Sequence, residues 1–328
     1  MITRVLGAVV ASFLAALCFG AAAEAQPGSR VTRIGWLSSG SPTTFAGRLA
    51  AFRDGLRELG HAEEAVFIEQ RWADGREELL PALAAELVRL KVAVLVAVGT
   101  PATRAVQAAT DTIPVVMIAV GDPVGTGLVK SLARPGGNVT GVSNLAADLS
   151  GKLLDLLREV APGVPRVAVL LNPANPVHPV YRRETEVAAE RVGIKVEPVE
   201  VRRAEELDES FAGMVRRQAG ALIVLPDPLS LIHRSRIVDL ANKHRLPAIY
   251  PVRDYAESGG LMSYGPYAPE LYRRAASYVD KVLKGTRPGE LPVEQPTRFE
   301  LVLNARTARL LGLAFAPSLL LRADRVIE

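Results

Sequence analysis

Small polar side chains follow several of the predicted strands, and they are the residues of this chain best suited to hold a small polar ligand. They are Ser39, Ser41, Thr100, Thr103 and Asp122 in the first half of the chain, and Asn172, Asp227 and Tyr264 in the second. Hydroxyl groups can donate hydrogen bonds to a carboxylate, and aspartate carboxylates can accept them from an ammonium group. The set therefore predicts a site for a zwitterion, with tyrosine beside an apolar or aromatic side chain.

The segment Gly99-Thr100-Pro101 has a second property that suits an anion. It places threonine near the N-cap and proline near the first position of a predicted helix. Free backbone N–H groups and the helix dipole at such a position favour a carboxylate. A local role competes with this one for each residue, because Ser, Asp and Pro commonly form caps and turns. Asp122-Pro123 and Asp227-Pro228 are typical turn formers, so both interpretations stay open.

Catalytic and metal-binding patterns are poorly represented. The four histidines show no metal-type spacing, and they are His61, His178, His233 and His244. No nucleophile elbow or phosphate-binding loop occurs, and the glycines at 121–127 lack the order of a dinucleotide fingerprint. We therefore predict no catalytic residue, no metal and no cofactor. Carboxylates are numerous, so a carboxylate pair serving a hydrolase or transferase remains an alternative.

The loops are positioned by strands and helices that alternate along the chain. Strands are predicted at residues 31–37, 66–71, 92–98, 114–120 and 139–143, then at 166–171, 194–201, 221–225, 247–250, 260–265 and 299–303. Helical periodicity lies between them, for example at Phe45, Leu49, Phe52 and Leu56. Alternating elements with apolar strands predict an α/β protein with parallel sheets.

The element order repeats once, which predicts two doubly wound parallel-sheet lobes joined by a multi-crossing hinge. We expect the N-terminal lobe to contain residues 31–144 plus 262–288, and the C-terminal lobe 145–261 plus 289–328. Ligands of open α/β sheets bind at the carboxyl ends of the strands. The polar loops of both lobes would then face one cleft, which closes like a clamshell.

Composition excludes several classes of protein. The chain has 328 residues, 49% apolar and 23% charged, which is typical of globular proteins and not of disordered or fibrous ones. The net charge of +4 comes without a long Lys/Arg block, so we predict no nucleic-acid partner.

The N-terminus resembles an export signal. Arg4, an apolar run over residues 5–23 and the site Ala23-Glu24-Ala25 predict a signal peptide over residues 1–25, cleaved after Ala25. A retained membrane anchor is the alternative. Cleavage would remove Cys18, the one cysteine of the chain, and with it thiol catalysis and disulfides. We predict a periplasmic location.

Four segments carry a resemblance to a known family. Residues 121–129 and 131–143, together with Arg71-Trp72-Ala73-Asp74-Gly75 and the ending at 316–324, resemble ABC transporter substrate-binding proteins of the tryptophan/tyrosine type. The resemblance implies a type I periplasmic-binding fold with three crossings between the lobes. It also implies capture of a small molecule and its delivery to an ABC permease in the inner membrane.

The resemblance places the loops of Thr100 and Asp122 on one side of the cleft and those of Asn172 and Asp227 on the other. The segment Pro226-Asp227-Pro228 departs from the Thr-Asp-Asn of family members with amino-acid ligands, so the exact ligand is not implied. We expect an exported solute-binding protein, not an enzyme, that works as a monomer on an amino acid or related small carboxylate. A periplasmic ligand-sensing module for a membrane receptor is the alternative from another class.

Overall fold

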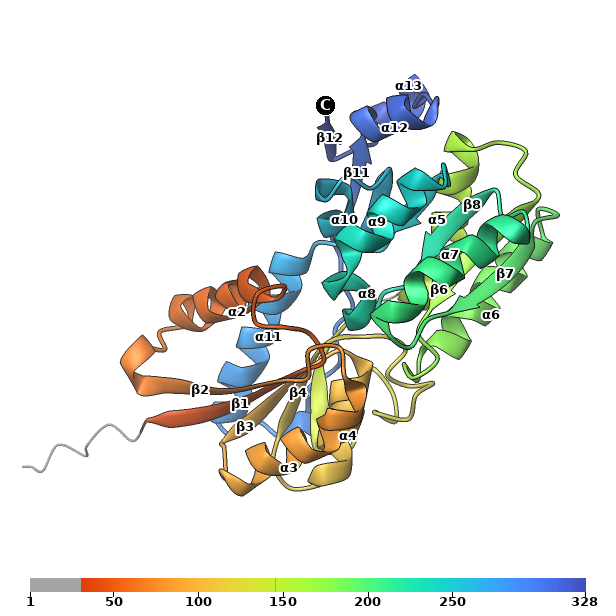
Figure 1. Cartoon of the computed structure of the whole chain (residues 1–328). Coiled ribbons are helices and arrows are strands. Elements are labelled where there is room, and N and C mark those ends of the chain that lie inside the picture. Colours follow the sequence, from red (N-terminus) through yellow and green to blue (C-terminus); the bar gives the residue numbers. More distant parts are fainter. Residues whose placement is uncertain (1–30, 145) are drawn as a thin grey trace, which may run out of the picture.

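A computed structural model describes residues 31–144 and 146–328, and it contains two α/β lobes with a cleft between them (Figure 1). The first sheet has the order β2-β1-β3-β4-β5, and all its strands are parallel. Its strands are β1 (Thr32–Ser38), β2 (Val66–Trp72), β3 (Val94–Val98), β4 (Val115–Val120) and β5 (Val139–Ser143).

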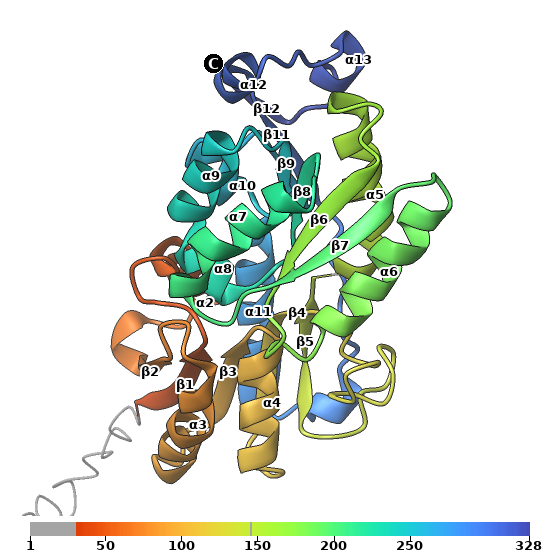
Figure 2. The same cartoon turned by 45° about the vertical axis from the view of Figure 1, so that its right-hand side comes forward.

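Helices cover both faces of the first sheet. They are α2 (Ala46–Glu58), α3 (Leu80–Arg89), α4 (Thr100–Ala109) and α11 (Ala268–Leu283), with the short 3-10 helices η1 (Glu63–Ala65), η2 (Glu77–Leu79) and η4 (Pro288–Glu290). Alternate residues of a strand point to opposite faces, so Val96 packs in the core of α2 and α11, and Leu95 in the core of α3 and α4. Helices α2 and α11 lie side by side although some two hundred residues separate them (Figure 2).

The second sheet has the order β12-β11-β10-β9-β8-β6-β7. Its strands are β6 (Arg166–Leu171), β7 (Lys195–Glu200), β8 (Ala221–Val224), β9 (Ala248–Tyr250), β10 (Met262–Pro266), β11 (Phe299–Asn304) and β12 (Arg325–Ile327). Its helices are α5 (Ala146–Val160), α6 (His178–Glu190), α7 (Leu207–Arg216), α8 (Pro228–Ile232), α9 (Arg234–Lys243), α10 (Arg253–Glu257), α12 (Ala305–Leu311) and α13 (Pro317–Leu320), with the 3-10 helix η3 (Ala204–Glu206). The strands from β7 to β10 are parallel, whereas β11 is antiparallel to β10 and β12 runs with β11.

The chain passes between the lobes after β5, after β10 and again before β11. The second passage lies later than the sequence suggested. Residues 262–266 were expected in the first lobe, but β10 pairs with β9 on one side and β11 on the other. Residues 289–294 were expected in the second lobe, yet Ser143 N donates to Glu294 O and Thr140 Oγ1 donates to Leu291 O along β5. The chain therefore leaves the first lobe after β5 and the second lobe after β10, in each case once that strand has joined its sheet.

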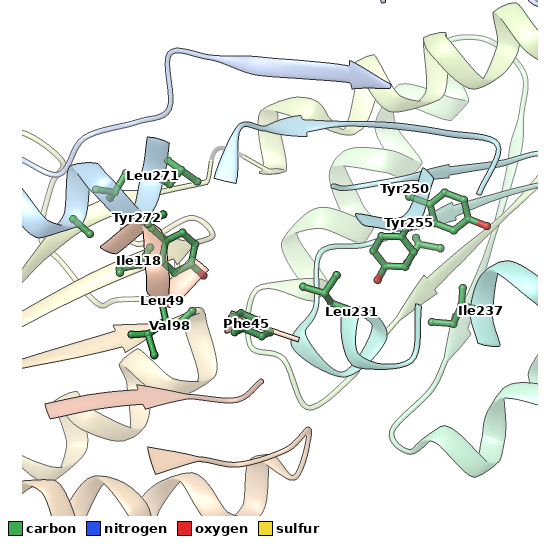
Figure 3. Close-up of a cluster of buried hydrophobic side chains, with 14 of the residues drawn as sticks. Phe45, Leu49, Val98, Ile118, Leu231, Ile237, Tyr250, Tyr255, Leu271 and Tyr272 are labelled. Atoms are coloured by element: carbon green, nitrogen blue, oxygen red, sulfur yellow. The ribbon is translucent and has the colours of Figure 1, made fainter. Parts of the chain in front are cut away.

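One apolar cluster extends across the cleft. Figure 3 shows Phe45, Leu49 and Tyr272 from the first lobe facing Leu231 and Tyr255 from the second. All five side chains are buried. Burial of apolar surface between the lobes favours the closed arrangement.

The predicted signal peptide and Cys18 lie outside the described residues. In residues 31–144 and 146–328, no helix combines the length and the apolar character needed to cross a membrane.

Candidate functional site

A cavity of about 120 Å³ lies between the lobes. It opens at the carboxyl ends of strands from both sheets, where parallel α/β folds bind ligands. Most of its wall is apolar or aromatic, formed by Phe45, Val98, Ala119, Leu149, Leu153, Val177, Tyr181, Leu225, Leu231, Val252, Tyr255, Tyr264, Ala268, Leu271 and Tyr272. Among the described residues that line it, Arg48 and Asp227 are the charged ones. An apolar chamber with few polar groups is typical of a small-molecule site.

The N-terminus of α4 forms the polar part of the first-lobe wall. Gly99 caps this helix with a φ of +84°, a conformation that glycine adopts without steric cost. Thr100 Oγ1 accepts a hydrogen bond from Gly121 N at 3.1 Å, which ties the end of β3 to the loop after β4. The first turn of α4 thus faces the cavity, and its N–H groups and dipole favour an anionic group there.

Asp227 forms the polar part of the second-lobe wall. It is 7% exposed, and it caps α8 by accepting from Leu229 N at 2.9 Å. Asn175 Nδ2 donates to Asp227 Oδ2 at 2.9 Å, and Asn172 Nδ2 lies 3.4 Å from Oδ1. These donors hold a buried carboxylate in one orientation at the edge of the cavity.

His178 holds together the two loops that carry these polar groups. Its ring is fully buried at the start of α6. Asn172 N donates to His178 Nδ1 at 2.8 Å, and His178 Nε2 donates to Pro226 O at 3.1 Å. One imidazole therefore fixes the spacing between the loop of Asn172 and the loop of Asp227.

An ion pair joins the lobes on one side of the cavity. Arg48 of α2 donates to both oxygens of Asp254 of α10, at 2.9 and 3.0 Å. Burial raises the pKa of Asp254, but the charge and hydrogen bonds of Arg48 outweigh burial and hold that pKa below its usual value. Burial lowers the pKa of Arg48, but Asp254, together with Tyr272 and Tyr255, more than offsets burial and raises that pKa. The guanidinium also lies 5.1 Å from the centre of the Phe45 ring.

A second polar contact joins the lobes at Asn172. Its amide nitrogen lies 3.3 Å from Glu77 Oε1 of η2 and also donates toward Asp227. Burial, and then the nearby Asp227 charge, raise the pKa of Glu77 from 4.5 to about 8. Two carboxyl groups from different lobes thus share one amide.

A third contact is made by Tyr181 of α6. Its hydroxyl donates to Asn144 Oδ1 at 3.1 Å, at the first passage between the lobes. It also fills the space beside Gly121, where a Cβ atom would lie 1.7 Å from the hydroxyl oxygen. With Arg48–Asp254 and Glu77–Asn172, this contact shows that the lobes are closed on each other.

A family model described as ABC transporter substrate binding protein matches residues 45–327. The match covers most of the chain. This protein belongs to the ABC transporter substrate-binding protein family.

Individual relatives of this substrate-binding protein agree with that assignment. A "Tyrosine-binding protein" of Clostridioides difficile is 28% identical over 232 residues, which are 70% of this chain and 66% of the relative. The chain thus spans slightly less than two thirds of that protein. An ABC domain from Streptococcus pneumonia, crystallised in complex with L-Trp, is 28% identical with a TM-score of 0.84, and the match covers 90% of this chain and 99% of that one. A conserved domain protein from Vibrio cholerae is 26% identical with a TM-score of 0.86, at the same coverage. The fold is that of type I periplasmic binding proteins.

Three of the predicted site residues of this substrate-binding protein line the cavity: Thr100, Asp227 and Tyr264. Asn172 lies behind Asp227 and lines a smaller hollow beside it. The sequence thus led to one polar group on each wall.

The other four predicted residues use their side chains differently or lie deeper. Ser41 Oγ accepts from Thr44 N, Thr103 Oγ1 donates to Gly99 O, and Asp122 Oδ1 accepts from Gly125 N. Each is a contact within its own loop or helix turn, the local role that competed with ligand binding. Ser39 is fully buried next to β1, and it does not appear among the described residues of the cavity wall.

Sequence reasoning missed Arg48, Asn175 and Glu77. Asn175 stands in the same Asn-Pro-Ala-Asn-Pro loop as Asn172, so its position after a strand was a usable signal. Arg48 lies in the first turn of α2, on a helix noticed only for its apolar face. Glu77 follows β2 at the cleft edge of the sheet, but its partner is 95 residues away.

Proposed function

We propose that this protein captures a free amino acid, or a related small carboxylate, between its lobes. The observation that carries the proposal is the cavity, which has a helix N-terminus on one wall and a fixed carboxylate on the other. Groups of opposite polarity on facing walls suit a zwitterion, and the relatives named for tyrosine and crystallised with L-Trp support the same ligand class.

The ligand carboxylate would lie at the first turn of α4, near Thr100. The ammonium group would donate to Asp227, which accepts from Leu229 and Asn175 and has capacity for another donor. The side chain would pack among Phe45, Tyr255 and Tyr272.

The cavity wall favours binding over hydrolysis. Glycosidase-type chemistry needs two carboxyl groups on either side of the substrate. Asp227 is the carboxylate among the described residues of the wall, and Glu77 lies beyond them. Family membership likewise assigns binding of a substrate as the role of the chain.

We propose further that the protein is exported to the periplasm and works there as a monomer. The closed, loaded form would be recognised by an ABC permease, which the family description supports. The predicted signal peptide gives the route of export.

A thermal-shift and calorimetric panel tests the proposed ligand class. The panel contains L-tyrosine, L-tryptophan, L-phenylalanine and L-leucine, with tyramine lacking the carboxylate and 3-(4-hydroxyphenyl)propionate lacking the ammonium group. A ligand at a hundred times its Kd stabilises the protein by about 2.7 kcal/mol. We expect an amino acid to bind and both truncated analogues to bind much more weakly. Equal binding of tyramine and L-tyrosine would exclude the carboxylate contact at α4, and binding confined to sugars would exclude the zwitterion.

A further inference from the structure

Glu77 and Asp227 come from different lobes, and both contact the side-chain amide of Asn172 at the edge of the cleft. Glu77 comes from η2 of the first lobe, and Asp227 caps α8 of the second. Asn172 Nδ2 is 3.3 Å from Glu77 Oε1, and 3.4 and 3.5 Å from the two oxygens of Asp227. The side-chain amide nitrogen of Asn172 carries two hydrogens, so it can donate one hydrogen bond to each carboxyl group. The carboxyl groups meet in this way only while the lobes are closed.

We propose that closure of the lobes takes up one proton at Glu77, so that acidic conditions favour the closed form. This inference concerns regulation of the proposed binding site and rests on the proposed function for its biological meaning. The physical reason is local: a half-buried Glu77 carboxylate next to Asp227 would face an uncompensated charge of the same sign. A protonated Glu77 removes that repulsion and still accepts from Asn172.

The charged groups that influence Glu77 are acidic, so binding a proton is the simplest way to neutralise its carboxylate. The electrostatic influences on it come from Asp227 and from its neighbour Glu78, and both are acidic. Asp227 accepts from three amide donors, Leu229 N, Asn175 Nδ2 and Asn172 Nδ2, whereas Glu77 shares only the last of them. The raised pKa of about 8 for Glu77 agrees with this assignment.

The other titratable groups near the contact respond differently. Burial raises the pKa of Tyr255, which packs near Asp227, so the phenol stays protonated at neutral pH. His178 lies behind Asn172, with its ring on the Asn172 backbone and on Pro226 O. A pH response due to His178 would survive replacement of Glu77, which allows the two to be separated.

The sign of the effect follows from linkage. In the open form Glu77 would be solvated, with a pKa near its ordinary 4.5, and in the closed form the pKa is about 8. Protonation therefore favours closure fully below 4.5, and this advantage is lost as pH rises toward 8. Within that window the closing equilibrium changes by up to about tenfold per pH unit.

Small-angle X-ray scattering of the ligand-free protein tests the proposal, because it needs no knowledge of the ligand. We expect a smaller radius of gyration at about pH 5 than at about pH 9. Glu77→Gln, which is neutral at every pH and keeps the acceptor for Asn172, should be compact at both. Glu78→Gln is the matched control, since it removes one charge from the same 3-10 helix at an exposed position; it should keep the pH response, because burial of Glu77 and the Asp227 charge, the larger influences, remain.

Three results would overturn the proposal: a radius that does not change with pH in the wild type, a pH response that persists in Glu77→Gln, or a Glu77→Gln protein as open as the wild type at high pH. Failure of every amino acid to bind would reject the proposed function and leave these scattering results unaffected. The proposed function and the proposed proton uptake can therefore be rejected independently of each other.

Discussion

Two of the polar contacts between the lobes involve charged groups, and they differ in the sign of those charges. Arg48 and Asp254 have opposite charges and share two hydrogen bonds. Glu77 and Asp227 have charges of the same sign, and a single amide lies between them. The first contact favours closure wherever Asp254 is ionised, whereas the second does so only when Glu77 holds a proton. The Arg48–Asp254 contact therefore favours closure wherever Asp254 is charged, and the Glu77–Asp227 contact makes closure depend on pH.

The largest expected effect is at Asp227, because its carboxylate is the proposed partner of the ligand ammonium group. Asp227→Ala removes the proposed ammonium partner and should cost about 2–5 kcal/mol of binding free energy, measured by calorimetry with the tightest amino acid of the panel. Asp122→Ala is the control, because that carboxylate accepts from Gly125 N in its own turn. Equal affinity of Asp227→Ala and wild type would reduce Asp227 to a helix cap.

The opposite-charge contact can be tested at Arg48. Arg48→Met keeps much of the side-chain volume but leaves Asp254 without its cation, and should weaken binding by about 2–3 kcal/mol. Arg57→Met is the control, because that exposed arginine pairs with Asp54 within the same helix. Unchanged affinity would mean that the ion pair contributes nothing to closure.

Closure also depends on an uncharged contact, which can be tested at Gly121. In Gly121→Ala the new Cβ would lie 1.7 Å from the Tyr181 hydroxyl oxygen, so the lobes cannot close fully. We expect a loss of about 1–3 kcal/mol in binding and a larger radius of gyration in the liganded protein. Gly47→Ala, where nothing lies near the added carbon, should behave like the wild type. A compact Gly121→Ala protein would show that Tyr181 moves aside.

The smallest effect should appear in acid, with the like-charge contact removed. In Glu77→Gln the remaining pH dependence comes from Asp254, whose pKa is held below its ordinary 3.8 in the closed form. The stabilisation is therefore present above 3.8 and is lost as pH falls through the lowered pKa. We expect scattering to show opening of Glu77→Gln only in strong acid. The added substitution Arg48→Met should abolish this response.

The sequence predicted the elements of this fold well because each strand is a local apolar run and each helix has a local period. It placed β10 less well, since the pairing of Met262 with Ile249 and Leu303 is not encoded in either run alone. The same limit applies to the site. Thr100 and Asp227 follow strands and line the cavity, whereas Ser41 and Asp122 also follow strands but accept hydrogen bonds within their own turns.

Arg48 and Glu77 were missed for a different reason. Their partners across the cleft are 206 and 95 residues away, and neither residue belongs to a recognisable local motif. Contacts between lobes are set by how the sheets face each other, so they become visible only in three dimensions. Residues that join the two lobes, such as Arg48 and Glu77, are therefore the hardest to predict from local sequence patterns.

The passage of the chain between the lobes also has a consequence for synthesis. Helix α11 covers α2 and the apolar face of the first sheet, yet it is made only after most of the second lobe. Domains fold as units while the chain emerges from its N-terminus. The first lobe therefore cannot complete its core until α11, which ends at residue 283 of 328, has been translated, so most of the second lobe is made while the first is still incomplete.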